Sequence, residues 1–287
     1  MSTSIPIRLA GDGVALAGDR YDAAPEDGVA MLLHGGGQTR HSWRSTAADL
    51  ATRNWTTVTL DLRGHGDSGW APDGNYSLEA FVEDLVVAVD QLRVEPVLVG
   101  ASLGGITALM AVGEHRVPAS GLVLVDIAPR VQAAGVERIQ RFMSARPEGY
   151  ADLEEVADAV AAYNPHRPRP RNLDGLRKNV RQGPDGRWHW HWDPAFLNFG
   201  DEPTRAIDHH RLMTAARNIQ VPTLMVRGAQ SDVVSAAGSA ELAAAIPQSV
   251  EVVTPGAGHM IAGDDNAVFT RELAGFLARV ASNGTTP

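Results

Sequence analysis

The chain has 287 residues, of which 44% are hydrophobic and 21% charged, and this ordinary globular composition excludes a disordered or fibrous protein. Its formal net charge of −9 argues against a nucleic-acid partner. It contains no cysteine, which excludes disulfides, thiolate metal ligands and a cysteine nucleophile. Without an apolar run long enough to cross a bilayer or the pattern of a signal peptide, we expect a cytoplasmic protein with no membrane partner.

The first part of the chain alternates strand and helix patterns. Residues 5–9 and 14–21 predict an antiparallel hairpin. Four short apolar runs follow, each ending at a histidine, aspartate or glycine: residues 29–33, 56–60, 97–99 and 122–125. Such runs are typical of strands buried on both faces of a parallel sheet. Between them, Ser77 is placed to cap a helix over residues 78–92, and small residues predict another helix over 103–113.

The alternation stops near residue 130 and resumes after residue 218. The segment 130–218 is irregular, with amphipathic helices predicted over residues 136–145 and 153–163. Beyond it, strands are predicted over residues 223–226 and 250–253, and helices over 236–245 and 266–280.

The simplest interpretation is an α/β fold interrupted by one insertion. We expect a mostly parallel central sheet of about eight strands flanked by helices, built from residues 1–129 and 219–287, with a helical cap over 130–218. The insertion begins just after the carboxyl end of a predicted strand, which is where open α/β sheets place their ligands.

The sharpest chemical signal is the sequence Gly100-Ala101-Ser102-Leu103-Gly104, between a predicted strand and a predicted helix. A strand that turns into a helix within about one residue needs small flanking residues and pushes the serine hydroxyl outward, at a helix N-terminus that favours a developing anion. A chance glycine-rich turn is the alternative. The strand before and the helix after favour Ser102 as a nucleophile.

A serine nucleophile needs a base and an acid that orients the base. His259 follows the last predicted strand in a glycine-rich loop and is our candidate base. Asp232, after the preceding strand, is our candidate acid, since chain order places the acid between nucleophile and base. Asp126 is the rival, because it also ends a strand.

Backbone donors for an oxyanion are expected in two places. The run His34-Gly35-Gly36-Gly37 follows a strand, and glycine lets a backbone N–H approach a substrate closely. We expect the N–H groups of Gly36 and Leu103 to form the oxyanion hole, with Gly37 as a further substrate contact. A phosphate-binding loop is the alternative, but no G-K-[ST] follows the glycines.

Aromatic side chains provide candidate pocket walls. Trp188, Trp190 and Trp192 alternate, so their indoles share one face of an extended segment. Packing of the cap against the core is the simpler explanation. The functional one makes Trp190 and Trp192 substrate-binding, together with Trp43. His189 and His191 alternate with the tryptophans, but no carboxylate cluster completes a metal site, so we predict no metal and no cofactor.

Along nearly its whole length the chain resembles the α/β-hydrolase fold superfamily. The resemblance is carried, in order, by residues 34–43 as the oxyanion loop, 61–68 as the D-x-R-G-H-G-x-S loop, 99–105 as the nucleophile elbow, and by the loops at 228–232 and 258–259. It implies a Ser102–Asp232–His259 triad and a helical cap. Epoxide hydrolases and haloalkane dehalogenases of this superfamily carry an aspartate where this chain has Ser102, so their chemistry does not follow.

The resembling subgroups leave several activities open. The first is a serine hydrolase acting on a small-molecule carboxylic ester or lactone through an acyl-enzyme. Cofactor-free perhydrolases (non-haem haloperoxidases) use the same residues with peroxide in place of water, and C–C bond hydrolases are further relatives. A non-enzymatic ligand sensor on the same fold is the remaining alternative. The sequence predicts neither the natural substrate nor the oligomeric state.

Overall fold

A computed structural model describes residues 3–164, 169, 171–198, 208–261 and 267–284. Its centre is an eight-stranded sheet in the order β1-β2-β4-β3-β5-β6-β9-β10. The first two pairings, β1 with β2 and β2 with β4, are antiparallel, and the others are parallel. The predicted sheet is therefore confirmed, with these strands: β1 (Ile5–Ala10), β2 (Ala15–Tyr21), β3 (Gly28–Leu33), β4 (Trp55–Leu60), β5 (Val97–Ala101), β6 (Gly121–Val125), β9 (Thr223–Gly228) and β10 (Ser249–Thr254).

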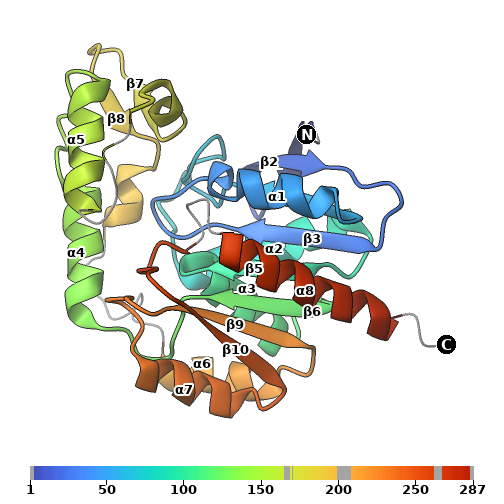
Figure 1. Cartoon of the computed structure of the whole chain (residues 1–287). Helices are drawn as coiled ribbons and strands as arrows, with labels where there is room; N and C mark the ends of the chain where they lie inside the picture. The colour runs from blue at the N-terminus through green and yellow to red at the C-terminus, as the bar shows by residue number, and fades with distance from the viewer. Residues whose placement is uncertain (1–2, 165–168, 170, 199–207, 262–266, 285–287) are drawn as a thin grey trace.

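Helices cover both faces of this sheet (Figure 1). Because side chains alternate along a strand, Ala30 and Leu32 of β3 pack under α1 (Arg44–Ala51) and α8 (Ala267–Gly284). Met31 and Leu33 point to the opposite face, into a larger hydrophobic core that also contains residues of the helices packed on that face. These are α2 (Leu78–Leu92), α3 (Leu103–Gly113), α6 (His209–Asn218) and α7 (Ala236–Ala245). Burial on both faces explains why the strands are continuously apolar.

Several helices begin and end where the sequence predicted, whereas the helix expected over 136–145 spans Ala133–Ser144 and the last helix ends at Gly284 instead of residue 280. Residue 266, the expected start of that last helix, lies outside the described residues. The Ser77 hydroxyl accepts a hydrogen bond from Ala80 N at 3.3 Å, so α2 begins at the predicted residue. The helices predicted over 103–113, 153–163 and 236–245 also have the expected bounds. In the described part of the chain, none of the helices combines the length and hydropathy that a bilayer crossing requires.

The inserted segment between β6 and α6, which we call the cap, lies beside the carboxyl ends of the parallel strands, at the left of Figure 1. It has a small hydrophobic core of its own, around Tyr150, Val156 and Leu176. Its elements are α4 (Ala133–Ser144), α5 (Leu153–Tyr163), η2 (Asp174–Lys178), β7 (Val180–Gln182), β8 (Trp188–Trp190) and η3 (Pro194–Leu197). The antiparallel pair β7–β8 makes this insertion less purely helical than expected.

The end of the insertion also differs from the expected residue 218. Helix α6 packs on α3, and Leu212, Ala215 and Ala216 belong to the main hydrophobic core. The approach is so close that a Cβ on Gly113 would lie 2.2 Å from the Ala215 carbonyl oxygen. Helix α6 is therefore part of the hydrolase core, because its apolar face is complementary to α3 rather than to the cap.

A buried ion pair fixes the loop that follows β4. Arg63 contacts Asp84 of α2 through Nε at 2.6 Å and Nη2 at 2.8 Å, and both residues are 3% exposed. Arg63 also donates to the carbonyls of Asn75 and Asp12, and Asp84 accepts from Asp12 N. Two buried charges can be stable only with such extensive hydrogen bonding. The pair joins β4, α2 and the β1–β2 turn.

We expect Arg63→Met to lower the free energy of unfolding by about 3–5 kcal/mol, because it leaves the Asp84 carboxylate buried without its counter-ion. Urea unfolding measures the change. Arg53→Met is the matched control, since the Arg53–Asp49 pair of α1 is largely exposed and its loss costs less than about 1 kcal/mol. Equal effects of the two substitutions would contradict a structural role for the buried pair.

Candidate active site

Ser102 lies at the turn between β5 and α3 with φ 47° and ψ −114°, a strained conformation for a residue with a Cβ. The turn is tight because the chain passes very close to itself. A Cβ on Gly100 would lie 2.3 Å from the Gly104 carbonyl oxygen, and one on Gly104 would lie 2.6 Å from that of Leu33. The glycines of the motif are thus required by space, and the predicted strand–turn–helix context of Ser102 is present.

Three side chains from separate strand ends form a hydrogen-bonded line. The Ser102 Oγ lies 3.2 Å from His259 Nε2, and His259 Nδ1 lies 2.7 Å from Asp126 Oδ2. The His259 and Asp126 side chains are 5% and 1% exposed. Since a carboxylate only accepts, Nδ1 carries the imidazole proton and Nε2 is left to accept the serine proton.

The acid in this line is Asp126, so the expectation that Asp232 orients His259 is wrong. Asp126 directly follows β6, the neighbour of the strand that carries Ser102. The end of β9 and the loop after it supply donors instead of a carboxylate: Gly228 N donates to Asp126 Oδ1 at 2.9 Å, and the Ser231 hydroxyl donates to Oδ2 at 2.5 Å.

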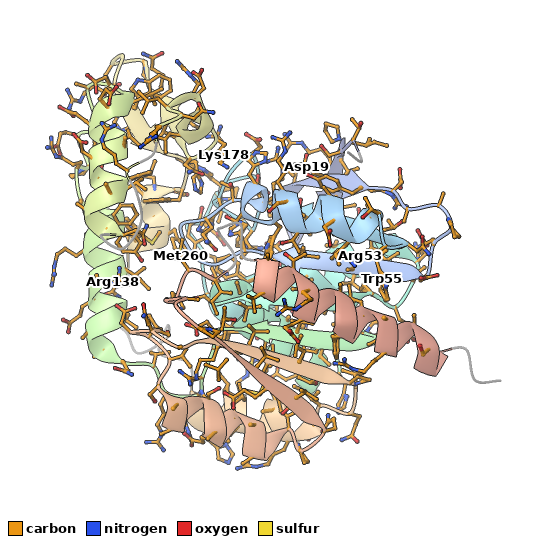
Figure 2. The ribbon with its side chains drawn as sticks, viewed as in Figure 1. Asp19, Arg53, Trp55, Arg138, Lys178 and Met260 are labelled. Carbon is orange, nitrogen blue, oxygen red and sulfur yellow. The ribbon has the colours of Figure 1, made fainter. Side chains whose placement is uncertain are left out.

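Asp232 points out of the site toward the cap. It accepts hydrogen bonds from Nε and Nη2 of Arg138 at 2.7 and 2.9 Å, and this guanidinium lowers the pKa of the Asp232 carboxyl. Figure 2 labels Arg138 on α4. Chain order could not separate the two aspartates, because both lie between Ser102 and His259. The choice depends on which of the two side chains turns toward His259, and this is decided by the packing of the loops after β6 and β9.

The glycine loop after β3 offers one free donor to a substrate. Gly35 N donates to Gln38 Oε1 at 2.9 Å, and Gly37 N donates to His65 Nε2 at 3.1 Å. Within the described ranges, Gly36 N and Leu103 N donate no hydrogen bond. Gly104 N donates to the His34 carbonyl at 3.2 Å, which ties the loop to the turn at Ser102. Gly36 and Leu103 are therefore available as expected, whereas the Gly37 N–H is already engaged.

The tryptophans have different positions. Trp43, at the end of η1 (Arg40–Trp43), is fully buried against Phe269 of α8 with ring centroids 5.7 Å apart, so its expected place in a pocket wall is wrong. Trp190 and Trp192 stack on each other at 5.0 Å, and Trp192 is 4% exposed inside the main core. These two indoles join the cap to the core, which was the simpler explanation.

Two cap side chains that the sequence did not point to lie against the glycine loop. Phe196 of η3 lies 3.6 Å from the position of a Cβ on Gly36, and Met143 of α4 lies 3.1 Å from that on Gly37. Both are buried in the main core. They therefore restrict the space next to the candidate oxyanion donors, and only the fold of the cap brings them there.

Beside this loop, His34, His65 and His191 form a cluster of buried imidazoles, 0%, 0% and 1% exposed. The His65 ring centroid lies 5.2 Å from that of His34 and 5.9 Å from that of His191. Burial lowers the pKa of His34 to about 4 and that of His65 to about 3, and it lowers the pKa of His191 well below its ordinary value. All three rings are neutral at pH 7. Among the described residues, neither these histidines nor any other three His, Asp or Glu side chains are arranged so that they could hold a metal ion together.

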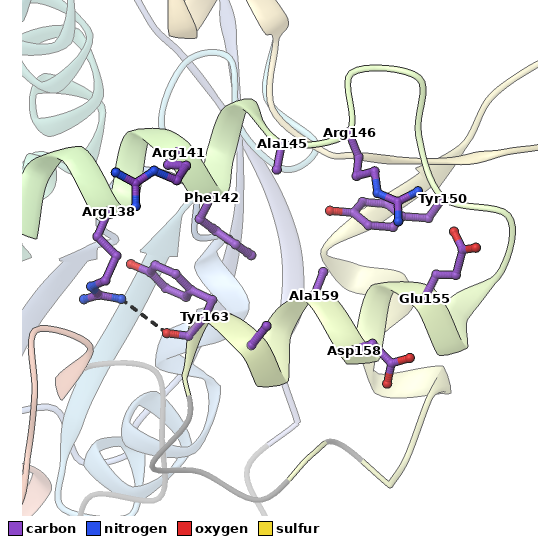
Figure 3. Close-up of a pocket in the computed structure, with 11 residues that line it drawn as sticks. Arg138, Arg141, Phe142, Ala145, Arg146, Tyr150, Glu155, Asp158, Ala159 and Tyr163 are labelled. Atoms are coloured by element: carbon purple, nitrogen blue, oxygen red, sulfur yellow. Dashed lines mark hydrogen bonds between the residues drawn. The ribbon is translucent and has the colours of Figure 1, made fainter.

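A separate cavity of about 510 Å³ lies in the cap between α4 and α5 (Figure 3). Its walls combine arginines with aromatic and small side chains, and one end is closed by Arg138, which donates to the Tyr163 carbonyl. Neither Ser102 nor His259 lines it. The cavity is therefore distinct from the hydrogen-bonded line around Ser102.

The imidazole cluster predicts a loss of stability in acid. Because folding lowers these pKa values, the folded protein keeps the rings neutral while the unfolded chain binds protons near pH 6.5. Their contribution is complete above that pH and is lost as the pH falls toward about 4. Urea unfolding at several pH values between 7 and 5 measures how steeply the free energy of unfolding falls with pH. We expect His65→Gln to reduce this slope by up to about 1.4 kcal/mol per pH unit. Identical slopes for the two proteins would contradict this.

Comparison with known proteins identifies the family of the chain. Residues 30–265 match the family model of the α/β hydrolase fold. Esterase Rv0045c of Mycobacterium tuberculosis is 32% identical over 218 residues, 74% of this chain and 70% of the relative. The 3-hydroxybutyrate-oligomer hydrolase of Cupriavidus necator is 30% identical over 243 residues, 80% of this chain and 82% of the relative.

Solved structures give the same result for the fold. The crystal structure of E-2-(acetamidomethylene)succinate hydrolase superposes with a TM-score of 0.81 at 22% identity, covering 96% of this chain and 100% of that one. That of Esterase Rv0045c gives a TM-score of 0.76 at 26% identity, covering 96% and 92%. With the five motifs in order and the sheet as expected, the chain belongs to the α/β-hydrolase fold family, as its sequence predicted.

Proposed function

We propose that this chain is a serine hydrolase that cleaves a small or medium carboxylic ester or lactone through an acyl-enzyme on Ser102. One observation carries the proposal: the line from Ser102 Oγ through His259 to Asp126, with distances of 3.2 and 2.7 Å, together with the unengaged N–H groups of Leu103 at the same turn and of Gly36 in the adjoining loop. This combination of nucleophile, base, acid and donors is the arrangement that acyl transfer requires.

In the first half of the reaction, His259 Nε2 accepts the hydroxyl proton as Ser102 Oγ attacks the ester carbonyl. Asp126 holds the imidazole in the required tautomer and stabilises the imidazolium that forms. The negative charge that develops on the carbonyl oxygen is stabilised by the N–H groups of Gly36 and Leu103 and by the N-terminus of α3. His259 then gives its proton to the leaving alcohol, and the acyl group remains on Ser102.

In the second half, water replaces the alcohol. His259 accepts a proton from the water, whose oxygen attacks the acyl carbon, and the same two N–H groups stabilise the new oxyanion. Collapse of this intermediate releases the acid and returns the proton to Ser102. Peroxide in place of water would give a peracid with the same residues, so the assay panel includes both nucleophiles.

The named relatives support ester-type substrates. One is called an esterase, and another a hydrolase of 3-hydroxybutyrate oligomers. The panel therefore contains short and medium acyl esters, lactones and 3-hydroxybutyrate oligomers. A ligand sensor on this fold would bind a small molecule without turnover, and efficient hydrolysis of any member of the panel argues against it.

Replacing the nucleophile tests the central claim. Ser102→Ala should lower kcat/KM for esters by at least about 10⁴-fold, because no acyl-enzyme can form. A fluorophosphonate probe should label the wild type at a single serine and leave this variant unlabelled. Ester turnover that survives the substitution, or a wild type that the probe does not label, would falsify the serine-hydrolase proposal.

Replacing each aspartate separately tests which one is the acid. Asp126→Asn should reduce kcat by about 10⁴-fold, because the amide favours the wrong imidazole tautomer. Asp232→Asn is the matched control: it breaks a half-exposed ion pair with Arg138 and should leave kcat close to the wild-type value. A larger loss of kcat in Asp232→Asn than in Asp126→Asn, measured by steady-state kinetics, would identify Asp232 as the acid.

A further inference from the structure

The first part of the oxyanion loop, residues 34–38, contains three consecutive glycines. Glycine has no side chain that could be packed in place by its neighbours, and its backbone samples more conformations than that of any other residue. Gly37 adopts a positive φ of 73°, which further favours glycine. A hydrogen-bond donor that must point at one position in space therefore needs anchors outside its own residue.

Such anchors fix the peptide unit that carries the Gly36 N–H. A trans peptide unit is planar, so its N–H points opposite to the carbonyl of the preceding residue. That carbonyl, of Gly35, accepts from His34 Nδ1 at 2.8 Å and from Gln38 N at 3.0 Å. The two donors on one side thus set the direction of the Gly36 N–H on the other.

The next two peptide units are each held by an imidazole. In the first, the Gly37 N–H donates to His65 Nε2 at 3.1 Å. In the second, the Gly37 carbonyl accepts from His191 Nε2 at 3.4 Å, and the Gln38 N–H of this same unit is the one that donates to the Gly35 carbonyl. Gly36 is therefore held between two anchored peptide units. Phe196 packs edge-on against the His65 ring at 4.6 Å and keeps that ring in place.

Each imidazole also binds the neighbouring loop, residues 61–66. His34 Nε2 accepts from Leu62 N at 3.0 Å, His65 Nδ1 donates to the Arg63 carbonyl at 2.9 Å, and His191 Nδ1 accepts from Gly66 N at 2.8 Å. Every ring uses one nitrogen as donor and the other as acceptor. Only a neutral imidazole in a single tautomer can do this.

We propose that His34, His65 and His191 are positioning residues that hold the Gly36 N–H in its orientation toward the reacting carbonyl oxygen, so that the oxyanion hole depends on the cap through His191. This inference rests on the proposed function. His34 and His65 come from the hydrolase core, whereas His191 directly follows β8 of the cap. A correctly placed cap is thus part of the machinery that orients the hole.

Paired amide substitutions at His65 separate positioning from simple packing. A glutamine amide reaches the place of Nε2 and can accept from Gly37 N, whereas an asparagine amide reaches only that of Nδ1 and can donate to the Arg63 carbonyl. Each variant keeps one of the two bonds. We expect His65→Asn to lower kcat by about 10- to 100-fold with little change in KM, and His65→Gln to retain most of the wild-type kcat.

The same pair at His191 tests the contribution of the cap. His191→Gln can still donate to the Gly37 carbonyl, whereas His191→Asn keeps only the contact with Gly66 N. We expect the asparagine variant to lose more kcat than the glutamine variant. His189→Asn is the matched control, because His189 lies on β8 two residues away, is partly exposed and contacts Asp185 rather than the oxyanion loop.

Affinity for a tetrahedral analogue provides a readout that a purely structural role would not move. A trifluoromethyl ketone or boronate that reacts with Ser102 places a negative oxygen in the hole. Its inhibition constant should rise in His65→Asn by about the same factor by which kcat falls, while His189→Asn leaves it unchanged. Urea unfolding of each variant shows whether stability alone accounts for the difference.

Two outcomes overturn the inference. One is equal kcat and equal analogue affinity for the asparagine and glutamine variants at both histidines. The other is a loss of kcat that follows the loss of stability and leaves analogue affinity unchanged. Either result keeps the serine-hydrolase proposal intact as long as the wild type turns over esters and is labelled at Ser102, so the two ideas fail separately.

Discussion

The candidate site depends on how closely the turn at Ser102 packs against the end of β3. The Gly104 N–H donates to the His34 carbonyl at 3.2 Å, and a Cβ on Gly104 would lie 2.6 Å from the Leu33 carbonyl oxygen. This approach places the first turn of α3, which carries Leu103, beside the glycine loop, which carries Gly36. A larger residue at position 104 would move these two elements apart, and with them the donors.

The order of the strands in the sheet brings the nucleophile and the acid of the site together. Strands β5 and β6 are neighbours, so the residues at their carboxyl ends, Ser102 and Asp126, lie near each other before any loop contributes. The loop after β10 then needs to bring only His259 between them. The loop after β9 stabilises the Asp126 carboxylate through Gly228 N and Ser231 Oγ. This leaves Asp232 free to bind the cap.

Local signals in the sequence predicted the parts of the site that local geometry determines. Ser102 and His259 were found because a strand–turn–helix motif and a glycine-rich loop after the last strand are contiguous patterns. Asp126 and Asp232 could not be separated in this way, because each follows a strand and the choice depends on which side chain turns inward.

Contacts between residues far apart in sequence could not be predicted. The place of Trp43 against Phe269 depends on a helix more than 200 residues later in the chain. His191 was noticed only as part of an alternation, because its partners Gly37 and Gly66 are far away in sequence.

The cap is joined to the core by contacts of two physical kinds. Near β8 they are buried: His191 lies against the oxyanion loop, and Asp193 N donates to the Gly64 carbonyl at 2.8 Å. At α4 they include the Arg138–Asp232 ion pair, whose side chains are 36% and 42% exposed, beside the buried contact of Met143 with Gly37. Dissolved ions screen exposed charges over about 8 Å at physiological ionic strength and affect buried contacts far less. Salt therefore weakens this ion pair selectively, while the buried contacts of His191 and Met143 with the oxyanion loop are retained.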